Sequence, residues 1–491
     1  MKIVIVGGGT SGWMTAAAVC KTFPEWDVTI VASGDSIGVG ESTTPHINEY
    51  LKYMNISDDV FLPAARATFK SSSRFEDFVA PGKVFHYPNG QSVSNEVEYH
   101  DWMQAKAFYP DKTPPFAEVL MPFVAVAEMG KMPLNDQLLF PYDLAKDRSF
   151  HINAKAFSEY LRDTFCKNIK VIDSKVKSVR IKKRNITSVL VDRGTHDIKP
   201  HEVCGDIYID CTGQQRVLSG SLSKWNSFDT ILTDSALVVK SEYTNRNEQM
   251  VPYTNAKGRT SGWEWTIPTY DFISRGYVFA SRFQSEEDAR KEFGYNDAHL
   301  IKFENGRHER AWTGNCISIG LSYGFIEPLE STSLFNTHHG ILALMDILQE
   351  GNSPGQFARD RFNHDLAEHM DGWREFVEAH YYYSERRDTP FWRAVTDEVE
   401  YKQEGSHEAI RHMMITGDPI PTGDMPIAFI LAGSGFTNVN KRTYEYLGYP
   451  ITIDQNTVDD WFCDWEARRE FALTLPTMSK FLSGTFDYEK G

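Results

Sequence analysis

The sequence predicts a mixed α/β fold, in which a parallel sheet is followed by a largely helical lobe. Three observations lead to this prediction. An apolar, β-branched run over residues 2–6 meets a glycine turn, and a helix-forming run begins at Trp13. Short apolar runs typical of buried strands recur at residues 206–210 and 315–321. Beyond about residue 355 the pattern is mostly helical, with a loop break at residues 419–426.

Composition restricts the class of protein. The chain has 491 residues, of which 41% are hydrophobic and 13% aromatic, so it can build a large core and two or three lobes. A net charge of −16 argues against a general nucleic-acid or anionic-membrane binder. The six cysteines are scattered without a CxxC pair, which favours a reducing compartment. Glycines interrupt the first apolar run and no run is long enough to span a bilayer, so we expect a cytoplasmic protein.

The glycine turn has the spacing of a dinucleotide-binding fingerprint. Gly7, Gly9 and Gly12 follow the first strand, with Thr10 and Ser11 between them. Gly7 permits the turn, Gly9 lets the backbone approach a pyrophosphate, and Gly12 lets the helix pack on the strand. The free N–H groups at the start of the helix then face the phosphates. We see no second fingerprint, so we expect no built-in NAD(P)H site.

The remaining elements follow in order. Residues 28–32 complete a βαβ unit, and residues 80–150 have poor periodicity, which indicates a long insertion. We expect helices at 46–62, 151–165 and 334–348, and strands at 171–172, 176, 179–191, 206–210, within 236–283 and at 315–321. The predicted organisation is a discontinuous domain over residues 1–355, with inserted strand-rich substrate segments, and a mainly helical substrate lobe over residues 356–491. Large FAD-dependent oxidoreductases have this organisation, with residues 210–213 as a second flavin-domain turn.

Four further segments resemble one family. They are a WxWxIP motif at Gly262–Pro268, the loop Gly38–Thr43, the turn Gly324–Ser333, which contains Pro-Leu-Glu-Ser-Thr, and Asp388–Trp392. Together with the glycine turn they are similar to the flavin-dependent halogenases of the tryptophan-halogenase superfamily. The resemblance covers residues 1 to about 340 and extends to residue 392. It implies an FAD-binding Rossmann-like domain of the aromatic-hydroxylase type with an additional, largely helical substrate-binding lobe.

The resemblance also implies a chemistry. Reduced FAD, dioxygen and a halide ion would give hypohalous acid, which passes through a tunnel to an electron-rich aromatic substrate of the indole, azole or phenol type. Lys70 would bind the hypohalous acid or form a haloamine with it, and Glu330 would orient the oxidant or accept the ring proton. Thr332 and Ser333 would hold the halide through backbone N–H groups. A separate flavin reductase would supply the reduced FAD.

The residues expected to contact the cofactor are spread over the chain. They are Gly7, Gly9, Thr10, Ser11, Gly12, Ser33, Glu41, Val176, Leu321 and Leu334. Trp263, Trp265 and Pro268 of the WxWxIP motif are expected near the flavin. Two residues on a strand separated by one position share a face, so the tryptophans are also typical of core packing. A lone lysine such as Lys70 is commonly a solvated surface group.

The chain departs from the family pattern at two places. The second strand ends with Ala32, where the family has a glutamate that binds the adenosine ribose, so FAD binding is expected to be weak. The C-terminal third has no clear match to the residues that grip free tryptophan. An FAD-dependent aromatic hydroxylase and a non-catalytic flavin-binding redox sensor remain alternatives, and a homo-oligomer is possible.

Two pairs of histidines are candidate metal ligands. His338 and His339 are adjacent, and His364 and His369 are five residues apart on an expected helix. Residues with that spacing do not share a helix face well. The sequence therefore predicts no metal site.

Overall fold

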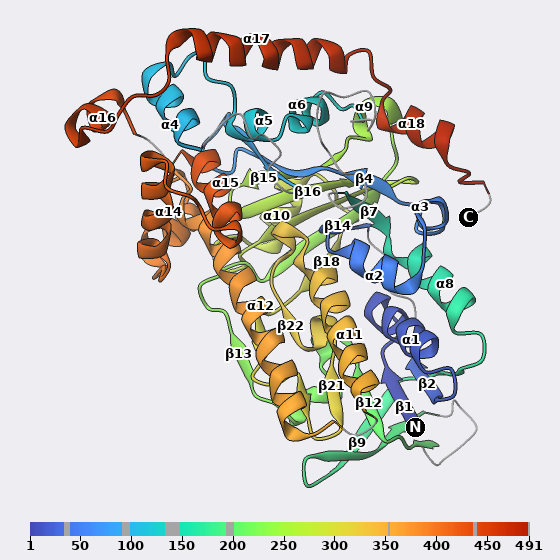
Figure 1. Cartoon of the computed structure of the whole chain (residues 1–491). Coiled ribbons are helices and arrows are strands. Elements are labelled where there is room, and N and C mark those ends of the chain that lie inside the picture. The colour runs from blue at the N-terminus through green and yellow to red at the C-terminus, as the bar shows by residue number, and fades with distance from the viewer. Residues whose placement is uncertain are drawn as a thin grey trace.

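The computed structural model describes residues 1–33, 40–90, 99–132, 148–192, 201–351, 354–435 and 439–489. The N-terminal sheet and its helices lie in the lower part of the view in Figure 1, and the helices of the C-terminal region gather at its upper left and top. Long helices α11 (Thr332–Glu350) and α12 (Gln356–Tyr382) run side by side between these regions.

The N-terminal sheet has six strands in the order β20-β21-β12-β1-β2-β8. Its strands are β1 (Lys2–Val6), β2 (Asp27–Ala32), β8 (Lys170–Asp173), β12 (Ile207–Asp210), β20 (Trp312–Thr313) and β21 (Cys316–Ser318). All neighbours pair in parallel except β20 with β21. In the register, Ile5 of β1 lies opposite Ile30 and Ile209. The sheet therefore collects strands from distant parts of the chain.

The turn after β1 has the close contacts that its glycines require. Gly7 has a φ of +117°, and a Cβ added there would lie 2.2 Å from the carbonyl oxygen of Cys211. A Cβ on Gly12 would lie 1.9 Å from the carbonyl oxygen of Gly7. Helix α1 (Thr10–Thr22) follows, and its alanines Ala16, Ala17 and Ala18 are fully buried. These contacts fix the turn, the helix and the strand as one unit.

A second, seven-stranded sheet has the order β18-β14-β17-β16-β15-β5-β6. Its strands are β5 (Ser72–Glu76), β6 (Val84–Pro88), β14 (Ser235–Ser241), β15 (Tyr253–Arg259), β16 (Gly262–Pro268), β17 (Ile273–Phe279) and β18 (His299–Lys302). Pairing is antiparallel except between β15 and β5. Three small sheets complete the strands: β3 (Gly40–Ser42), β7 (Ser149–Asn153) and β4 (Thr68–Lys70); β11 (His201–Val203), β10 (Asn185–Val191) and β9 (Val176–Lys182); β13 (Trp225–Ser227), β19 (Gly306–His308) and β22 (Gly324–Phe325).

The helical lobe draws on two parts of the chain. Helices α4 (Tyr99–Phe108), α5 (Phe116–Leu120) and α6 (Phe123–Glu128) supply apolar residues to one cluster with α12, α14 (Glu404–Thr416), α15 (Met425–Ser434) and α16 (Lys441–Leu447). Helix α17 (Gln455–Ala472) packs on α5 and α6, and α18 (Met478–Thr485) returns to β4. The shorter helices are α9 (Arg246–Gln249), α10 (Glu286–Phe293) and α13 (Pro390–Arg393). The division at residue 355 stays a prediction.

Two expected helices have different bounds in the structure. The helix expected at 46–62 is two helices, α2 (Ile47–Met54) and α3 (Asp58–Ala64), because Asn55 adopts a left-handed conformation with a φ of 57° and ends the first. The helix expected from residue 151 begins at Ala154, as α8 (Ala154–Phe165). The three preceding residues belong to β7, whose pairing with β3 and β4 overrides their helical spacing.

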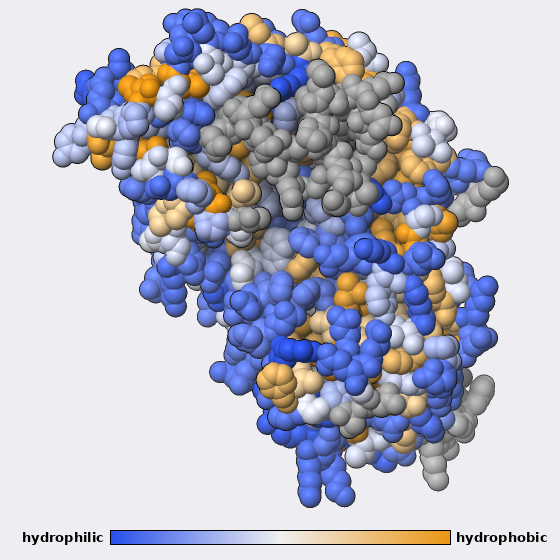
Figure 2. Space-filling model, viewed as in Figure 1, coloured by the Kyte–Doolittle hydropathy of each residue, from blue (hydrophilic) through white to orange (hydrophobic). Residues whose placement is uncertain are grey.

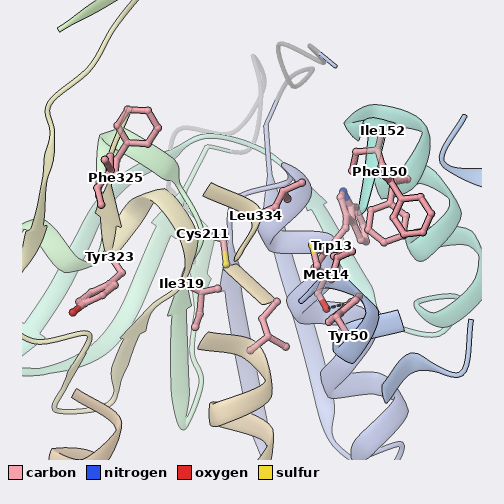
Figure 3. Close-up of a cluster of buried hydrophobic side chains, with 14 of the residues drawn as sticks. Trp13, Met14, Tyr50, Phe150, Ile152, Cys211, Ile319, Tyr323, Phe325 and Leu334 are labelled. Carbon is pink, nitrogen blue, oxygen red and sulfur yellow. Dashed lines mark hydrogen bonds between the residues drawn. The ribbon is translucent and has the colours of Figure 1, made fainter. Parts of the chain in front are cut away.

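The main core extends from the N-terminal sheet and its helices to the seven-stranded sheet, α12, α13 and α18. Figure 3 shows Trp13, Met14 and Tyr50 together on one side of Leu334 and Cys211. The Tyr50 hydroxyl donates a hydrogen bond of 2.8 Å to the carbonyl oxygen of Met14, which joins α2 to α1. This core holds the glycine turn and the start of α11 close to each other.

The face shown in Figure 2 is mainly hydrophilic, which agrees with the acidic composition. Hydrophobic residues gather on it at the upper left, over the helices that Figure 1 labels α14 and α16. Within the described ranges, no helix is both long and apolar enough to cross a membrane.

Candidate active site

A pocket opens where the glycine turn, β3 and α11 meet. It is lined by Gly9, Thr10, Ser11, Glu41, Cys211, Gly213, Leu321, Ser333, Leu334 and Thr337. Six of the predicted cofactor residues are in this group, together with the predicted halide residue Ser333. The structure therefore brings together segments that lie more than 300 residues apart in the sequence.

The chemistry of this pocket fits a dinucleotide such as FAD. A Cβ added to Gly9 would meet nothing within 4 Å, so the backbone is open to a close approach. No side chain caps the first turn of α1 and no acidic residue lies in it, which leaves N–H groups for a phosphate. Burial raises the pKa of Glu41 to about 7, against a hydrogen bond with Thr10 that lowers it. Glu41 can thus be neutral beside an anionic cofactor.

Four predicted cofactor residues have other places. Gly7 and Gly12 shape the turn without lining the pocket. Ser33 is exposed after β2, and Val176 begins β9, where it packs on a separate apolar cluster. Ala32 lies beside the turn, because a Cβ on Gly8 would stand 2.5 Å from the Ala32 Cβ. Gly38 and Val39 of the loop motif lie outside the described residues.

Lys70 is a buried residue, not a solvated one. It ends β4, and only 2% of it is exposed. Its Nζ donates hydrogen bonds of 3.2 Å to the carbonyl oxygen of Thr43 and to Oγ of Ser331. Burial lowers the pKa of Lys70 to about 8, although the carboxylate of Glu330 opposes this shift. An amine that changes charge near neutral pH in a closed site is typical of a functional group.

Glu330 is buried beside Lys70 and has partners of its own. It ends the 3-10 turn Pro328–Glu330 and is 3% exposed. Oε2 accepts a hydrogen bond of 3.1 Å from the Ser73 hydroxyl, and Oε1 lies 2.9 Å from Nε2 of His380. His380, on α12, was not predicted. A single histidine within a helical pattern carries no signal of a partner 50 residues away.

The hydrogen bonds around His380 determine how many protons the pair holds. Nδ1 of His380 lies 2.8 Å from the carbonyl oxygen of Phe376, which can only accept, so Nδ1 carries a proton. Nε2 faces the Glu330 carboxyl group, and this contact needs a second proton. The pair is therefore an imidazolium with a carboxylate, or an imidazole with a carboxylic acid.

The segment from Glu330 to Leu334 connects the Lys70–Glu330 pair with the proposed cofactor pocket. Ser331 is left-handed with a φ of 60° and bonds Lys70, whereas Ser333 and Leu334 line the cofactor pocket. Helix α11 begins at Thr332 without a side-chain cap, and the buried Thr332 hydroxyl has no hydrogen-bond partner among the residues that the structure describes. Free N–H groups and an unsatisfied hydroxyl at a helix start fit an anion such as a halide.

The WxWxIP strand lies in the core. Trp263 and Trp265 are 1% and 7% exposed, share a face of β16, and have ring centroids 6.1 Å apart. Neither lines the cofactor pocket. The carbonyl oxygen of Pro268 accepts a hydrogen bond of 2.6 Å from Thr68, two residues before Lys70. The strand thus supports the lysine segment.

Glu327 is a second buried carboxyl group that sequence reasoning missed. Oε1 accepts a hydrogen bond of 2.5 Å from the Tyr381 hydroxyl, and Oε2 accepts one from Thr233. Burial raises the pKa of Glu327 to about 7, against the hydrogen bonds it accepts. It fixes the turn before Glu330 to α12.

Comparison with known proteins identifies the family of the chain. The family model described as "Tryptophan halogenase" matches residues 2–414. The chain is 32% identical over 434 residues to the tryptophan 6-halogenase SttH of Streptomyces toxytricini, with 80% of each chain covered. Its structure is similar to that of VirX1, with a TM-score of 0.88, 32% identity and coverage of 99% and 98%. It is also similar to BrvH, a flavin-dependent halogenase from Brevundimonas, with a TM-score of 0.82, 27% identity and 99% of each chain covered. The chain therefore belongs to the tryptophan halogenase family.

Proposed function

We propose that this chain is a flavin-dependent halogenase that acts on an electron-rich aromatic ring. Bound reduced FAD would supply two of the electrons that reduce dioxygen and the halide ion the other two: FADH2, O2, X− and H+ give FAD, HOX and water. The halogen then replaces a ring hydrogen, so that ArH and HOX give ArX and water. The observation that carries the proposal is the buried Lys70 and Glu330 beside the uncapped start of α11.

The residues of the chain have distinct roles in this proposal. The first turn of α1 binds the pyrophosphate, and Leu321 and Leu334 hold the flavin. The N–H groups at Thr332 and Ser333 bind the halide. The Lys70 ammonium donates a hydrogen bond to the hypohalous acid and directs its halogen toward the substrate. Glu330 accepts the proton that the ring loses.

The Lys70 environment supports this role. Its two present hydrogen bonds go to a carbonyl oxygen and a hydroxyl, so an ammonium group has a third N–H to donate. Burial excludes water, which would compete for the oxidant. Glu330 lies close enough to influence the pKa of Lys70. Donor and proton acceptor therefore act in one closed space.

A product assay tests the function. The purified chain is incubated with FAD, NADH, a flavin reductase, a mixture of indoles and phenols, and chloride, bromide or iodide in turn. Mass spectrometry should detect products in which hydrogen is replaced by the halogen supplied. Products that gain oxygen without dependence on halide would instead support an aromatic hydroxylase. Flavin binding without any product would support a redox sensor.

The need for a separate reductase is a further part of the proposal. It rests on the single glycine fingerprint at the N-terminus. NADH and FAD with this chain alone should give no halogenated product, and addition of a reductase should restore it. Oxidation of NADH by the chain alone at enzymatic rates would contradict the two-component scheme.

A further inference from the structure

Three side chains of α11 and α12 converge away from the proposed active site. His339 is on α11, and Asp365 and His369 are on α12. Each offers one ligand atom, and the three atoms lie within 4.8 Å of one another. Nε2 of His339 is 2.9 Å from Oδ2 of Asp365, and the two imidazole centroids are 4.0 Å apart. Nδ1 of His369 lies 3.5 Å from Oδ1 of Asp365, so His369 contacts both other side chains.

The group contains the donors that first-row transition metals prefer. Imidazole nitrogen and carboxylate oxygen are usual ligands of Zn²⁺ and its neighbours. Asp365 and His369 are four residues apart, so they share one face of α12. Nδ1 of His369 lies 2.9 Å from the carbonyl oxygen of Asp365, which only accepts, so the lone pair is on Nε2. A backbone carbonyl that orients a histidine in this way is typical of metal sites.

Neighbouring residues hold the two rings in place. The Phe335 ring is stacked on His339, with a 5.4 Å centroid separation and a 10° interplanar angle, and it is 5.9 Å from His369. A hydrogen bond to Asp365 is sufficient reason for the position of His339. It does not account for the packing of the His369 imidazole against the same two side chains.

We propose that His339, Asp365 and His369 bind a divalent transition-metal ion, with Zn²⁺ as the reference ion, which crosslinks α11 to α12. Three protein ligands whose side chains are 24%, 37% and 38% exposed leave coordination positions for water. A groove between the helices, with Asp346 and Arg361 in its lining, reaches one member of the group, Asp365.

The ion would act on structure and not on the proposed chemistry. Thr337 lines the cofactor pocket, and its Oγ1 lies 3.1 Å from Oγ of Ser11. His339 is two residues further along α11, so its side chain is rotated by about 200° around the helix axis from that of Thr337. Helix α11 begins at the proposed halide site, and α12 carries His380. A crosslink between them would stabilise the relative position of these two elements.

Metal binding is tested on the full chain after treatment with EDTA and its removal. All proteins carry Cys204→Ser and Cys463→Ser, because both thiols are exposed and could bind Zn²⁺. Calorimetric titration with Zn²⁺ should give one site per chain. His369→Ala and Asp365→Asn should each weaken this binding by about tenfold or more. The matched control is His364→Ala on the same helix, whose side chain is 82% exposed and which should bind as the parent does.

Thermal unfolding gives an independent reading. Zn²⁺ at about 100 times its dissociation constant should raise the Tm of the parent and of His364→Ala by about 2–3 °C. It should leave the Tm of His369→Ala unchanged. Equal Tm values in EDTA would show that the variant folds. Absence of binding by the parent, or equal binding by the parent and His369→Ala, would overturn the proposal.

Discussion

Nε2 of His380 lies 2.9 Å from Oε1 of Glu330, and both side chains are almost fully buried. The contact joins α12 to the turn that precedes α11. It fixes one carboxyl oxygen, while Ser73 fixes the other. The orientation of Glu330 toward Lys70 therefore depends on a residue in the helical region.

His380→Gln and His380→Leu test this dependence. Gln can still donate a hydrogen bond to Glu330, whereas Leu leaves a buried carboxyl group with one partner. We expect kcat to fall by about tenfold or more in the Leu variant and less in the Gln variant, with little change in KM. An unchanged kcat in a folded Leu variant would mean that His380 only packs.

Lys70→Met should abolish halogenation while oxidation of reduced flavin by dioxygen continues. It should also stabilise the fold. The folded pKa of Lys70 is about 8 against an ordinary 10.5, so the unfolded chain binds the proton better. This burial cost grows as the pH falls from about 10.5 to 8 and remains below that. At pH 7 its removal, less the two hydrogen bonds that Nζ donates, should raise the Tm by about 1–3 °C.

The control for this variant is Lys52→Met, on the exposed side of α2. It removes the same charge and should leave product yield unchanged. Near wild-type yield from Lys70→Met would show that the lysine has no role in the reaction. Product is measured by mass spectrometry, and flavin oxidation by absorbance.

Halogenation should decline as the pH rises through about 8. Burial lowers the pKa of Lys70 to about that value, so the ammonium donor is lost over this range. The rate is measured with chemically reduced FAD, so that the reductase does not contribute to the profile. A rate that increases through the same range would indicate that the neutral amine reacts, as a haloamine requires.

Gly9→Ala and Gly7→Ala should separate cofactor binding from folding. Gly9 has a φ of −80°, and an added Cβ meets no atom of the described residues within 4 Å, so the variant should fold. The methyl group would stand where the cofactor approaches, and we expect FAD affinity to fall by about tenfold or more. Gly7→Ala should fail to fold, because its Cβ would lie 2.2 Å from a carbonyl oxygen at a φ of +117°.

A helical glycine is the control for these variants. Gly372→Ala on α12 also adds a methyl group where nothing lies within 4 Å. It should leave FAD affinity unchanged, as measured by fluorescence titration. Equal FAD affinity in Gly9→Ala and the parent would mean that the cofactor does not approach this turn.

The strand, glycine turn and helix at the N-terminus were predictable because their signals are local. Gly12 is required by its contact with the carbonyl oxygen of Gly7 in the same turn, whereas the atom closest to an added Cβ on Gly7 belongs to Cys211, after β12. The burial of Lys70 was not predictable from residues alone, since its partner Ser331 is 261 positions away. Lys70 was predicted from the resemblance to the family, whereas His380 was not.

The histidine pairs illustrate the same limit. His364 and His369 are five residues apart on one helix, a spacing that is unfavourable for a shared metal ion. The structure instead combines His369 with Asp365 on its own helix and with His339 on α11. Helix–helix packing brings these groups together, and the periodicity of either helix alone does not predict it.

Free tryptophan should not be the best substrate. A zwitterion needs a carboxylate for its ammonium group and donors for its own carboxylate. The segment Tyr381–Arg387 would be placed to supply these groups, but its polar side chains already have partners. Tyr381 donates to Glu327, Arg386 pairs with Asp388, and Arg387 pairs with Asp397. Residues 436–438, which could also contribute, lie outside the described residues.

Electron-rich rings without the zwitterion should therefore be preferred. The test is a competition between tryptophan and simple indoles at equal concentration, with halogenated products quantified by mass spectrometry. We expect the indoles to be consumed first. They carry no charged groups, so their binding does not require the site to break its existing ion pairs. A strong preference for tryptophan, with halogen at one ring position, would contradict this prediction. It would mean that groups not engaged in these ion pairs bind the amino acid.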